Sequence, residues 1–163
     1  MTSRSLRLLP CLSLSLLFSL LTTPLRAQAK LAVYGTIGGE TSGVSSWTTA
    51  GTLGLYIGVK DLGPIALALD GRADLSSNIK SGLVGPRIAL HPPVFPLKPY
   101  AELLIGGSSV NKQSSQFAGR YVLGVDTTIL PRVDWRVIEF SEGINKFANG
   151  HAKTVSTGLV LRF

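Results

Sequence analysis

The segment Ile65–Leu75 carries charged residues at alternate positions, and this alternation restricts the possible folds more than any other feature of the chain. Asp70, Arg72 and Asp74 share one parity, whereas the other parity is wholly apolar or small. Successive side chains of a β-strand point to opposite faces, so the pattern predicts a strand with one charged face and one apolar face. Such a strand fits either a soluble sheet that exposes its charges to water or a membrane barrel that turns its apolar face toward lipid.

Seven further segments show the same period of two, and polar or proline-containing connections separate them. After residue 29, no run approaches the roughly 18 consecutive apolar residues that a membrane-spanning helix requires. The apolar character is therefore distributed over short strands. We expect strands at Leu31–Gly39, Trp47–Lys60, Ile65–Leu75, Gly82–Leu90, Tyr100–Gly107 and Phe117–Ile129, a strand beginning at Val133, and a last strand at Lys153–Phe163.

Residues 1–29 have the features of a cleaved signal peptide. Arg4 and Arg7 precede an apolar core, and Ala27-Gln28-Ala29 matches a small-x-small cleavage site. Cleavage leaves residues 30–163 as one domain and removes the only cysteine, so no disulfide is expected. Three of the 16 basic residues lie in the leader, which leaves 13 against nine acidic residues, a formal charge of +4. Because no basic cluster remains, we do not expect nucleic acid as a partner.

The connections alternate in character along the chain. Those at residues 40–46, 76–81, 108–116 and 142–152 are polar, whereas those at 61–64, 91–99 and 130–132 contain proline. Outer-membrane barrels show this asymmetry between extracellular loops and periplasmic turns. Two aromatic girdles are also expected. Trp47, Phe117, Phe140 and Phe147 would lie near the loop end, and Tyr100, Trp135 and Phe163 near the turn end.

Together these features resemble the small eight-stranded outer-membrane barrels of the OmpA-like family, without a peptidoglycan-binding domain. The resemblance rests on the leader and on five stretches: Gly82–Arg87, Pro99–Glu102, Gly124–Asp126, Asp134–Arg136 and the terminal Phe163. It implies an all-β, antiparallel, up-and-down eight-stranded transmembrane β-barrel in the cell outer membrane, surrounded by outer-membrane lipids and lipopolysaccharide. It also implies that the barrel-assembly machinery is a partner during biogenesis and reads Leu159, Leu161 and Phe163 as the assembly signal.

The inward parity of the expected strands predicts a charged interior. An eight-stranded barrel is just wide enough for side chains to fill it. Charges buried there must pair, because an unpaired buried charge costs several kcal/mol. We therefore expect a filled, non-conducting lumen, with a small ion-conducting porin as the alternative. The expected network comprises four acids and four bases: Asp70, Arg72, Asp74, Arg87, Glu102, Arg120, Asp126 and Arg136.

Two positions interrupt the alternation. Pro86 lies inside an expected strand, and because proline donates no backbone hydrogen bond we expect a bulge or kink there. Glu139 falls on the lipid-facing parity. Either a bulge near Ile138 or an early exit of the strand from the membrane would restore the pattern.

We expect a structural or surface-interaction function, in which the polar loops determine what the protein binds. A lipid A-modifying enzyme would need a serine, a histidine and an acid in contact. His91 lies in a proline-rich turn and His151 lacks a serine two positions later, so no catalytic residue is assigned. A soluble lipocalin-like periplasmic barrel would reverse the two faces. No cofactor or metal is expected, because the mature chain has no cysteine and no clustered histidines.

Overall fold

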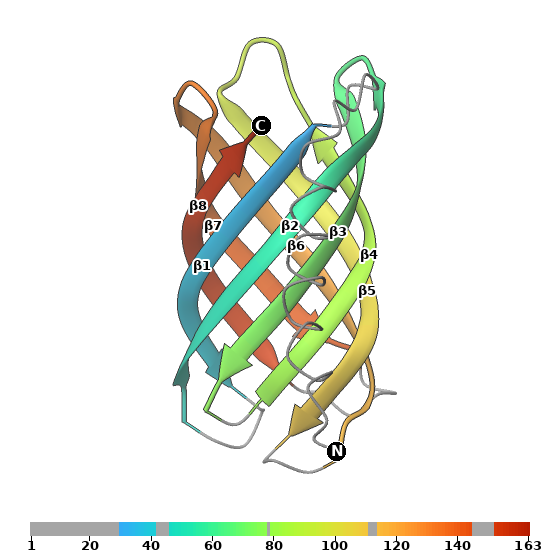
Figure 1. Cartoon of the computed structure of the whole chain (residues 1–163). Helices are drawn as coiled ribbons and strands as arrows, with labels where there is room; N and C mark the ends of the chain where they lie inside the picture. The colour runs from blue at the N-terminus through green and yellow to red at the C-terminus, as the bar shows by residue number, and fades with distance from the viewer. Residues whose placement is uncertain (1–29, 42–45, 78, 111–113, 145–151) are drawn as a thin grey trace, which may run out of the picture.

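A computed structural model describes residues 30–41, 46–77, 79–110, 114–144 and 152–163. These residues form a closed barrel of eight antiparallel strands, each paired with its neighbours in sequence (Figure 1). The expected all-β, up-and-down eight-stranded fold is confirmed. Within the described ranges, no helix is long and apolar enough to cross a membrane. The strands are β1 (Leu31–Thr41), β2 (Thr48–Leu62), β3 (Ile65–Ser76), β4 (Ile79–Leu90), β5 (Leu97–Val110), β6 (Gln116–Leu130), β7 (Val133–Gly143) and β8 (Lys153–Arg162).

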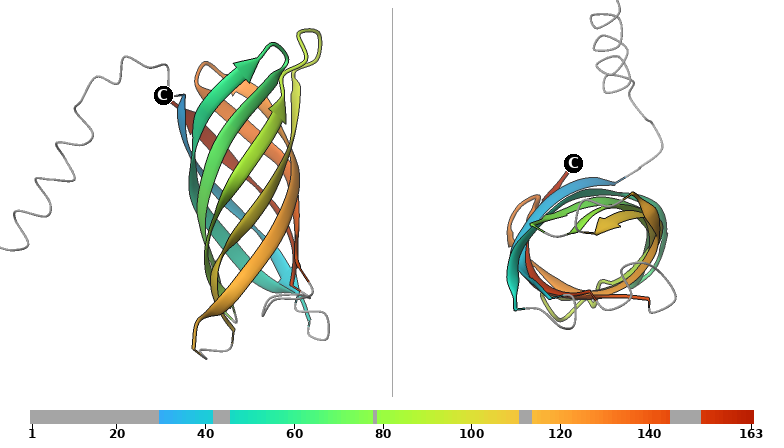
Figure 2. Two further views of the ribbon diagram at one scale, coloured as in Figure 1. Left: turned by 90° about the vertical axis from the view of Figure 1, so that its right-hand side faces the viewer. Right: turned by 90° about the horizontal axis from the view of Figure 1, so that it is seen from below.

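The first and last strands close the barrel. β1 pairs with β8 from Ala32 opposite Arg162 to Thr41 opposite Lys153. The view along the barrel shows the resulting continuous ring of strands (Figure 2). Closure leaves no unpaired sheet edge, which is the condition for a sheet to cross a lipid bilayer. The expected signal peptide, residues 1–29, lies outside the described residues.

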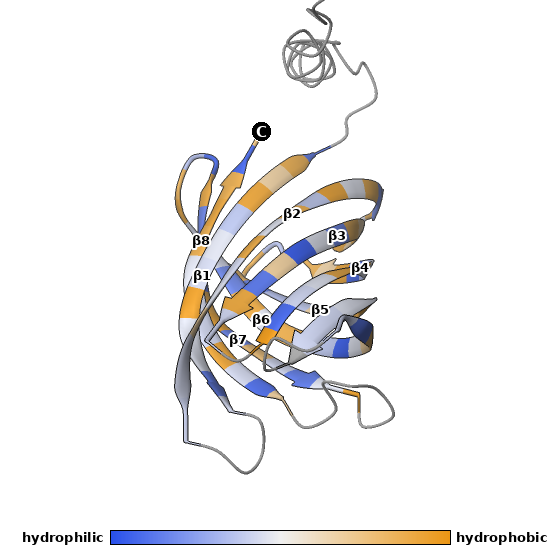
Figure 3. Ribbon diagram, turned by 60° about the horizontal axis from the view of Figure 1, so that its bottom comes forward, coloured by the Kyte–Doolittle hydropathy of each residue, from blue (hydrophilic) through white to orange (hydrophobic). Residues whose placement is uncertain are grey.

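The strands separate a polar interior from an apolar exterior. β4 shows the alternation of buried and exposed residues most simply, since it runs from Ile79 to Leu90 without exception. Hydrophilic and hydrophobic residues alternate along the ribbons in Figure 3. The exposed large apolar side chains include Leu53 and Leu103, at 64% and 53% exposure. In an isolated soluble protein such a surface would be a liability, but it matches the lipid-facing belt of a membrane barrel.

Two sequence-based expectations are wrong. Of the bulge or kink expected at Pro86, the bulge does not form, because β4 and β5 keep one register from Val84 opposite Ile105 to Arg87 opposite Glu102. Close approach replaces the bulge: a Cβ added at Gly85 would overlap a backbone carbonyl of β5. Tyr100 does not belong to the turn-end girdle, since it shares the parity of Glu102 and is buried in the lumen. By contrast, the side chains of Trp47, Phe117, Trp135 and Phe163 are exposed on the outside; Phe147 lies outside the described residues.

The ambiguity at Glu139 is resolved by a bulge in β7. The pairing of β7 with β8 shifts register between Arg136 and Glu139, and the pairing with β6 shifts at the same level. The extra residue leaves Ile138 exposed and turns Glu139 into the lumen, where it is 3% exposed. A β-bulge commonly redirects a side chain in this way.

Candidate functional site in the barrel lumen

All eight charged residues assigned to the interior from the sequence are buried in the lumen. Three further acids are buried with them: Glu40, Asp134 and Glu139. Asp134 has the same parity as Arg136, so the alternation could have identified it. Glu40 has the same parity as the inward-facing residues of β1, but it lies beyond Gly39, where the strand was expected to end. β1 in fact continues to Thr41. Glu139 could not be assigned without the bulge.

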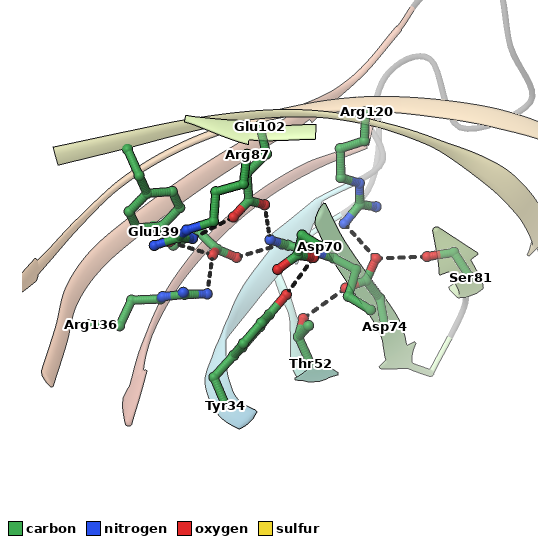
Figure 4. A network of polar contacts seen from close by, with 12 residues as sticks. Tyr34, Thr52, Asp70, Asp74, Ser81, Arg87, Glu102, Arg120, Arg136 and Glu139 are labelled. Atoms are coloured by element: carbon green, nitrogen blue, oxygen red, sulfur yellow. Dashed lines mark hydrogen bonds and ion pairs between the residues drawn. The ribbon is translucent and has the colours of Figure 1, made fainter. Parts of the chain in front are cut away.

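Arg72 joins opposite sides of the barrel. Its Nη1 donates to Oε1 of Glu139 on β7 at 2.9 Å, and its Nη2 donates to Glu102 on β5. Nε lies 3.5 Å from Oδ1 of Asp70 on the same strand. β3 and β7 are four strands apart in a closed barrel of eight, so the Arg72–Glu139 pair runs across the lumen. Figure 4 shows Glu102 beside Arg87, and Glu139 beside Arg136, in this part of the lumen.

The remaining pairs complete a closed cycle of alternating charge. Arg87 donates to Glu102 at 2.5 Å and to Asp126 at 2.9 Å. Arg136 donates to Asp126 at 3.0 Å and to Glu139 at 2.8 Å. With the two bonds from Arg72, three guanidinium groups and three carboxylates alternate around the lumen. We call this set the six-residue ring: Arg72, Glu102, Arg87, Asp126, Arg136 and Glu139. Its formal charge is zero, which offsets part of the desolvation cost of burying six ions.

Tyrosine rings fill the space beside these guanidinium groups. The carbon centre of Arg87 lies 3.6 Å from the Tyr100 ring centroid and 4.5 Å from that of Tyr56. That of Arg136 lies 4.2 Å from Tyr34 and 4.7 Å from Tyr100. These distances fit cation–π contacts, which strengthen when the groups are desolvated. The arginines are therefore held by packing as well as by charge.

Two of the tyrosine hydroxyls also bond the acids. Tyr34 donates to Asp70 at 2.9 Å, and Tyr100 donates to Oε2 of Glu139 at 2.7 Å. Each of these rings lies over a glycine on a neighbouring strand. A Cβ at Gly54 would overlap the Tyr34 ring, and one at Gly124 would overlap the Tyr100 ring. The glycines leave the space that the phenol ends of the two tyrosines occupy.

A second cluster lies toward the loop end of the barrel. Arg120 on β6 donates to Asp74 at 3.0 Å and lies 3.4 Å from Glu40 on β1. Thr52 and Ser81 also donate to Asp74, at 2.8 and 2.7 Å. This cluster again joins strands that are not neighbours, so the lumen is bridged at two levels (Figure 4).

The candidate assembly residues face outward at the end of the chain. Leu159, Leu161 and Phe163 are all exposed on the exterior. That position leaves them open to lipid or to another protein. Their role as an assembly signal stays a prediction.

Of the two histidines in the sequence, the structure describes the placement of His91. His91 lies in the connection between β4 and β5, and His151 lies outside the described residues. Among the side chains that the structure describes, no three His, Cys, Asp or Glu residues are grouped so as to hold a metal ion. The lumen itself contains paired charges and tyrosines, an arrangement that holds strands together and fills space.

No protein-family model matches the chain, and a search of curated proteins gives no match. Solved structures do match. A de novo designed transmembrane β-barrel has a TM-score of 0.60 at 17% identity, covering 83% of this chain and 96% of the design. The fold is that of a small eight-stranded transmembrane β-barrel.

Natural outer-membrane proteins share this fold with the chain. Neisserial surface protein A has a TM-score of 0.54 at 15% identity, with 82% of this chain and 96% of that chain covered. The outer membrane enzyme PagL has a TM-score of 0.53 at 14% identity, with 80% and 98% covered. A designed barrel, a surface protein and an enzyme thus share one architecture. Function must be argued from this chain's own residues.

Proposed function

We propose that this protein is a structural and surface-interacting barrel of the outer membrane whose lumen is closed to ions. The observation that carries the proposal is the six-residue ring, in which Arg72 and Glu139 pair across the lumen. The tyrosines beside the ring fill the cross-section that an aqueous path would need. The polar loops then remain as the part of the barrel that meets partners outside the membrane.

The energetics of the ring support closure. Opening a path would separate buried ion pairs, and a charge left uncompensated in the barrel interior costs about 3–5 kcal/mol. Each 1.4 kcal/mol lowers the population of the open state about tenfold. A state with even one pair broken is therefore rare, and one with several pairs broken is rarer still. This argument favours a closed barrel over the porin alternative.

The distribution of polarity supports a membrane location. The exterior carries the apolar side chains and the interior carries the charges. A lipocalin-like soluble barrel needs the opposite arrangement, with an apolar cavity and a polar exterior. The resemblance to natural outer-membrane barrels and the predicted signal peptide favour the outer membrane in particular.

Cell fractionation and gel migration test the location together. We expect the protein in the outer-membrane fraction, extractable only with detergent, with different migration before and after boiling. Release by osmotic shock without detergent would contradict the proposal. A Leu103→Arg variant provides a matched control, because a charge on the lipid-facing side should reduce the heat-modifiable fraction while leaving expression unchanged.

A further inference from the structure

A cavity of about 210 Å³ lies inside the barrel at the end formed by the turns after β2, β4 and β6. We call it the turn-end vestibule; among the residues that bound it are Ala32, Tyr56, Arg87, His91, Lys98 and Arg162. The buried Arg87–Asp126 pair forms its inner limit. The six-residue ring therefore separates this cavity from the loop half of the lumen.

The two sides of the turn-end vestibule differ in chemistry. Strands β1, β3 and β4 contribute alanines, and strands β5 to β8 contribute charged side chains; Arg87 on β4 and Asp61 on β2 also line the cavity. The small side chains create the space, because alanine leaves room that a larger residue would fill. The alanines are Ala32, Ala66, Ala68 and Ala89, and the charged residues of β5 to β8 are Lys98, Asp126, Asp134 and Arg162, of which Arg162 pairs with Ala32 on the neighbouring strand. A ligand suited to these walls has an apolar body and a charged group.

On the charged side, Asp126 is paired with Arg87, and the charged residues that remain, Lys98, Arg162 and Asp134, carry a net charge of +1. Asp134 accepts hydrogen bonds from Lys98 at 3.0 Å and from Thr128 at 2.7 Å, and it lies 3.0 Å from Arg162. Two cations thus share one carboxylate. In the described part of the chain, Nε of Arg162 is buried without a hydrogen-bond partner. One unit of positive charge on this side of the vestibule is therefore left for an anion.

His91 lies beside this excess charge. Its backbone N–H donates to the carbonyl of Pro64 at 2.6 Å, which ties the β4–β5 connection to the neighbouring turn. Partial burial, followed by the positive charges of Lys98 and Lys30, lowers the pKa of His91; Arg162 acts in the same direction and Asp61 opposes them. A bound anion would offset these positive charges and so raise the pKa of His91. The imidazole therefore reports on whether the vestibule is occupied.

We propose that the turn-end vestibule binds a small amphipathic anion, a phosphate or carboxylate on a short apolar body. Lys98 and Arg162 hold the anionic group, with His91 beside it, and the alanine wall receives the apolar body. Binding here needs no open pore, because the Arg87–Asp126 pair closes the inner side. The proposal goes beyond a structural role, since it gives the turn end of the barrel a ligand of its own.

The test uses the folded barrel in octyl glucoside, a detergent without phosphate, with a His151→Gln substitution so that His91 gives the only histidine signal. Butyl phosphate, inorganic phosphate and butanol are titrated while the His91 ring is followed by NMR. We expect saturable binding of butyl phosphate with a rise in the pKa of His91. Inorganic phosphate should bind at least about tenfold more weakly, because it lacks the apolar body. Butanol should cause no pKa change.

Matched variants locate the binding. Lys98→Met should weaken butyl phosphate binding about tenfold, the loss of roughly one charge-assisted hydrogen bond. Lys60→Met removes an exposed lysine at the same end that does not line the vestibule, and binding should be unchanged. Ala89→Leu should fill the apolar wall and remove the preference for butyl phosphate. Heat-modifiable migration of each variant establishes that it is folded.

Two results would overturn the proposal. One is the absence of a saturable His91 shift with butyl phosphate in the folded barrel. The other comes from nanodiscs without added butyl phosphate: a His91 shift with phosphatidylglycerol but not with phosphatidylcholine would assign the anion to a lipid headgroup. The expected result is that neither lipid shifts His91, because headgroups surround the barrel and the vestibule lies within it.

Discussion

The guanidinium of Arg72 on β3 lies 2.9 Å from the carboxylate of Glu139 on β7, on the opposite side of the barrel. Both side chains are at least 97% buried. Two strands that share no backbone hydrogen bond are thereby connected through the lumen. The ion pair therefore spans the barrel and helps to close its lumen.

Removing Arg72 should destabilise the barrel strongly. Arg72→Met leaves Glu102 and Glu139 without one of their partners, so the free energy of unfolding should fall by about 3–5 kcal/mol. Urea unfolding in detergent measures this change. Lys153→Met is the control, because its 3.5 Å pair with Glu142 is solvent-exposed and should contribute less than about 1 kcal/mol. Equal losses in the two variants would contradict the central role of the ring.

A double-mutant cycle tests the cross-lumen contact itself. Arg72→Met, Glu139→Gln and the combined variant should show a favourable interaction energy of about 1–3 kcal/mol, because the two groups are in direct contact. The same unfolding measurement supplies all three values. Additive losses would mean that Arg72 and Glu139 act independently, which is incompatible with the ion pair described here.

The glycines beneath the tyrosines should be intolerant of a methyl group. Gly124→Ala would push the Tyr100 ring out of its position and should cost about 1–3 kcal/mol, as overpacking does elsewhere. Gly71→Ala is the matched control, since nothing lies within 4 Å of a Cβ added there. Thermal or urea unfolding of both variants measures the two losses of stability. A loss of stability in Gly71→Ala as large as in Gly124→Ala would show that strand glycines matter for another reason.

A charge on the outer face should cost stability only at the depth of the membrane. Leu103→Arg, near the middle of β5, should destabilise the barrel in lipid by about 2–4 kcal/mol. Val94→Arg, in the exposed β4–β5 connection, should have little effect. Unfolding from lipid vesicles measures both variants. Similar small effects at the two positions would indicate that the apolar belt does not face lipid.

Deleting Phe163 should impair assembly more than stability. The side chain is 71% exposed, so its removal loses little packing. In cells we expect less heat-modifiable protein in the outer membrane, while the purified variant refolds in detergent with nearly unchanged unfolding. Normal outer-membrane levels without Phe163 would show that the terminal aromatic is not read during assembly.

The alternation of residues was enough to predict the fold, because each strand repeats a period of two and the charged side chains of the strands fall on the inward parity. The same pattern assigned Asp70, Arg72 and Asp74 to the interior. It could not assign Glu139, since a bulge depends on how β7 pairs with both neighbours. Nor could it show that the six-residue ring is closed. The contact between Arg87 and Asp126 depends on their side-chain rotamers and not on their spacing in the sequence.

Pro86 and Tyr100 show where local rules were misleading. Proline in a strand suggested a bulge, but the neighbouring Gly85 lets the strands approach and keeps the register. An aromatic near a strand end suggested a girdle, yet parity with Glu102 directs Tyr100 inward. In both cases pairing across strands outweighed a preference based on one residue type.

Single-channel recording in planar bilayers tests the closed lumen most directly. We predict no steady conductance from the refolded protein, because the six-residue ring and its tyrosines fill the cross-section. A folded variant with both Arg72→Ser and Glu139→Ser should conduct more than the natural sequence. Large, steady conductance from the unaltered protein would contradict the account.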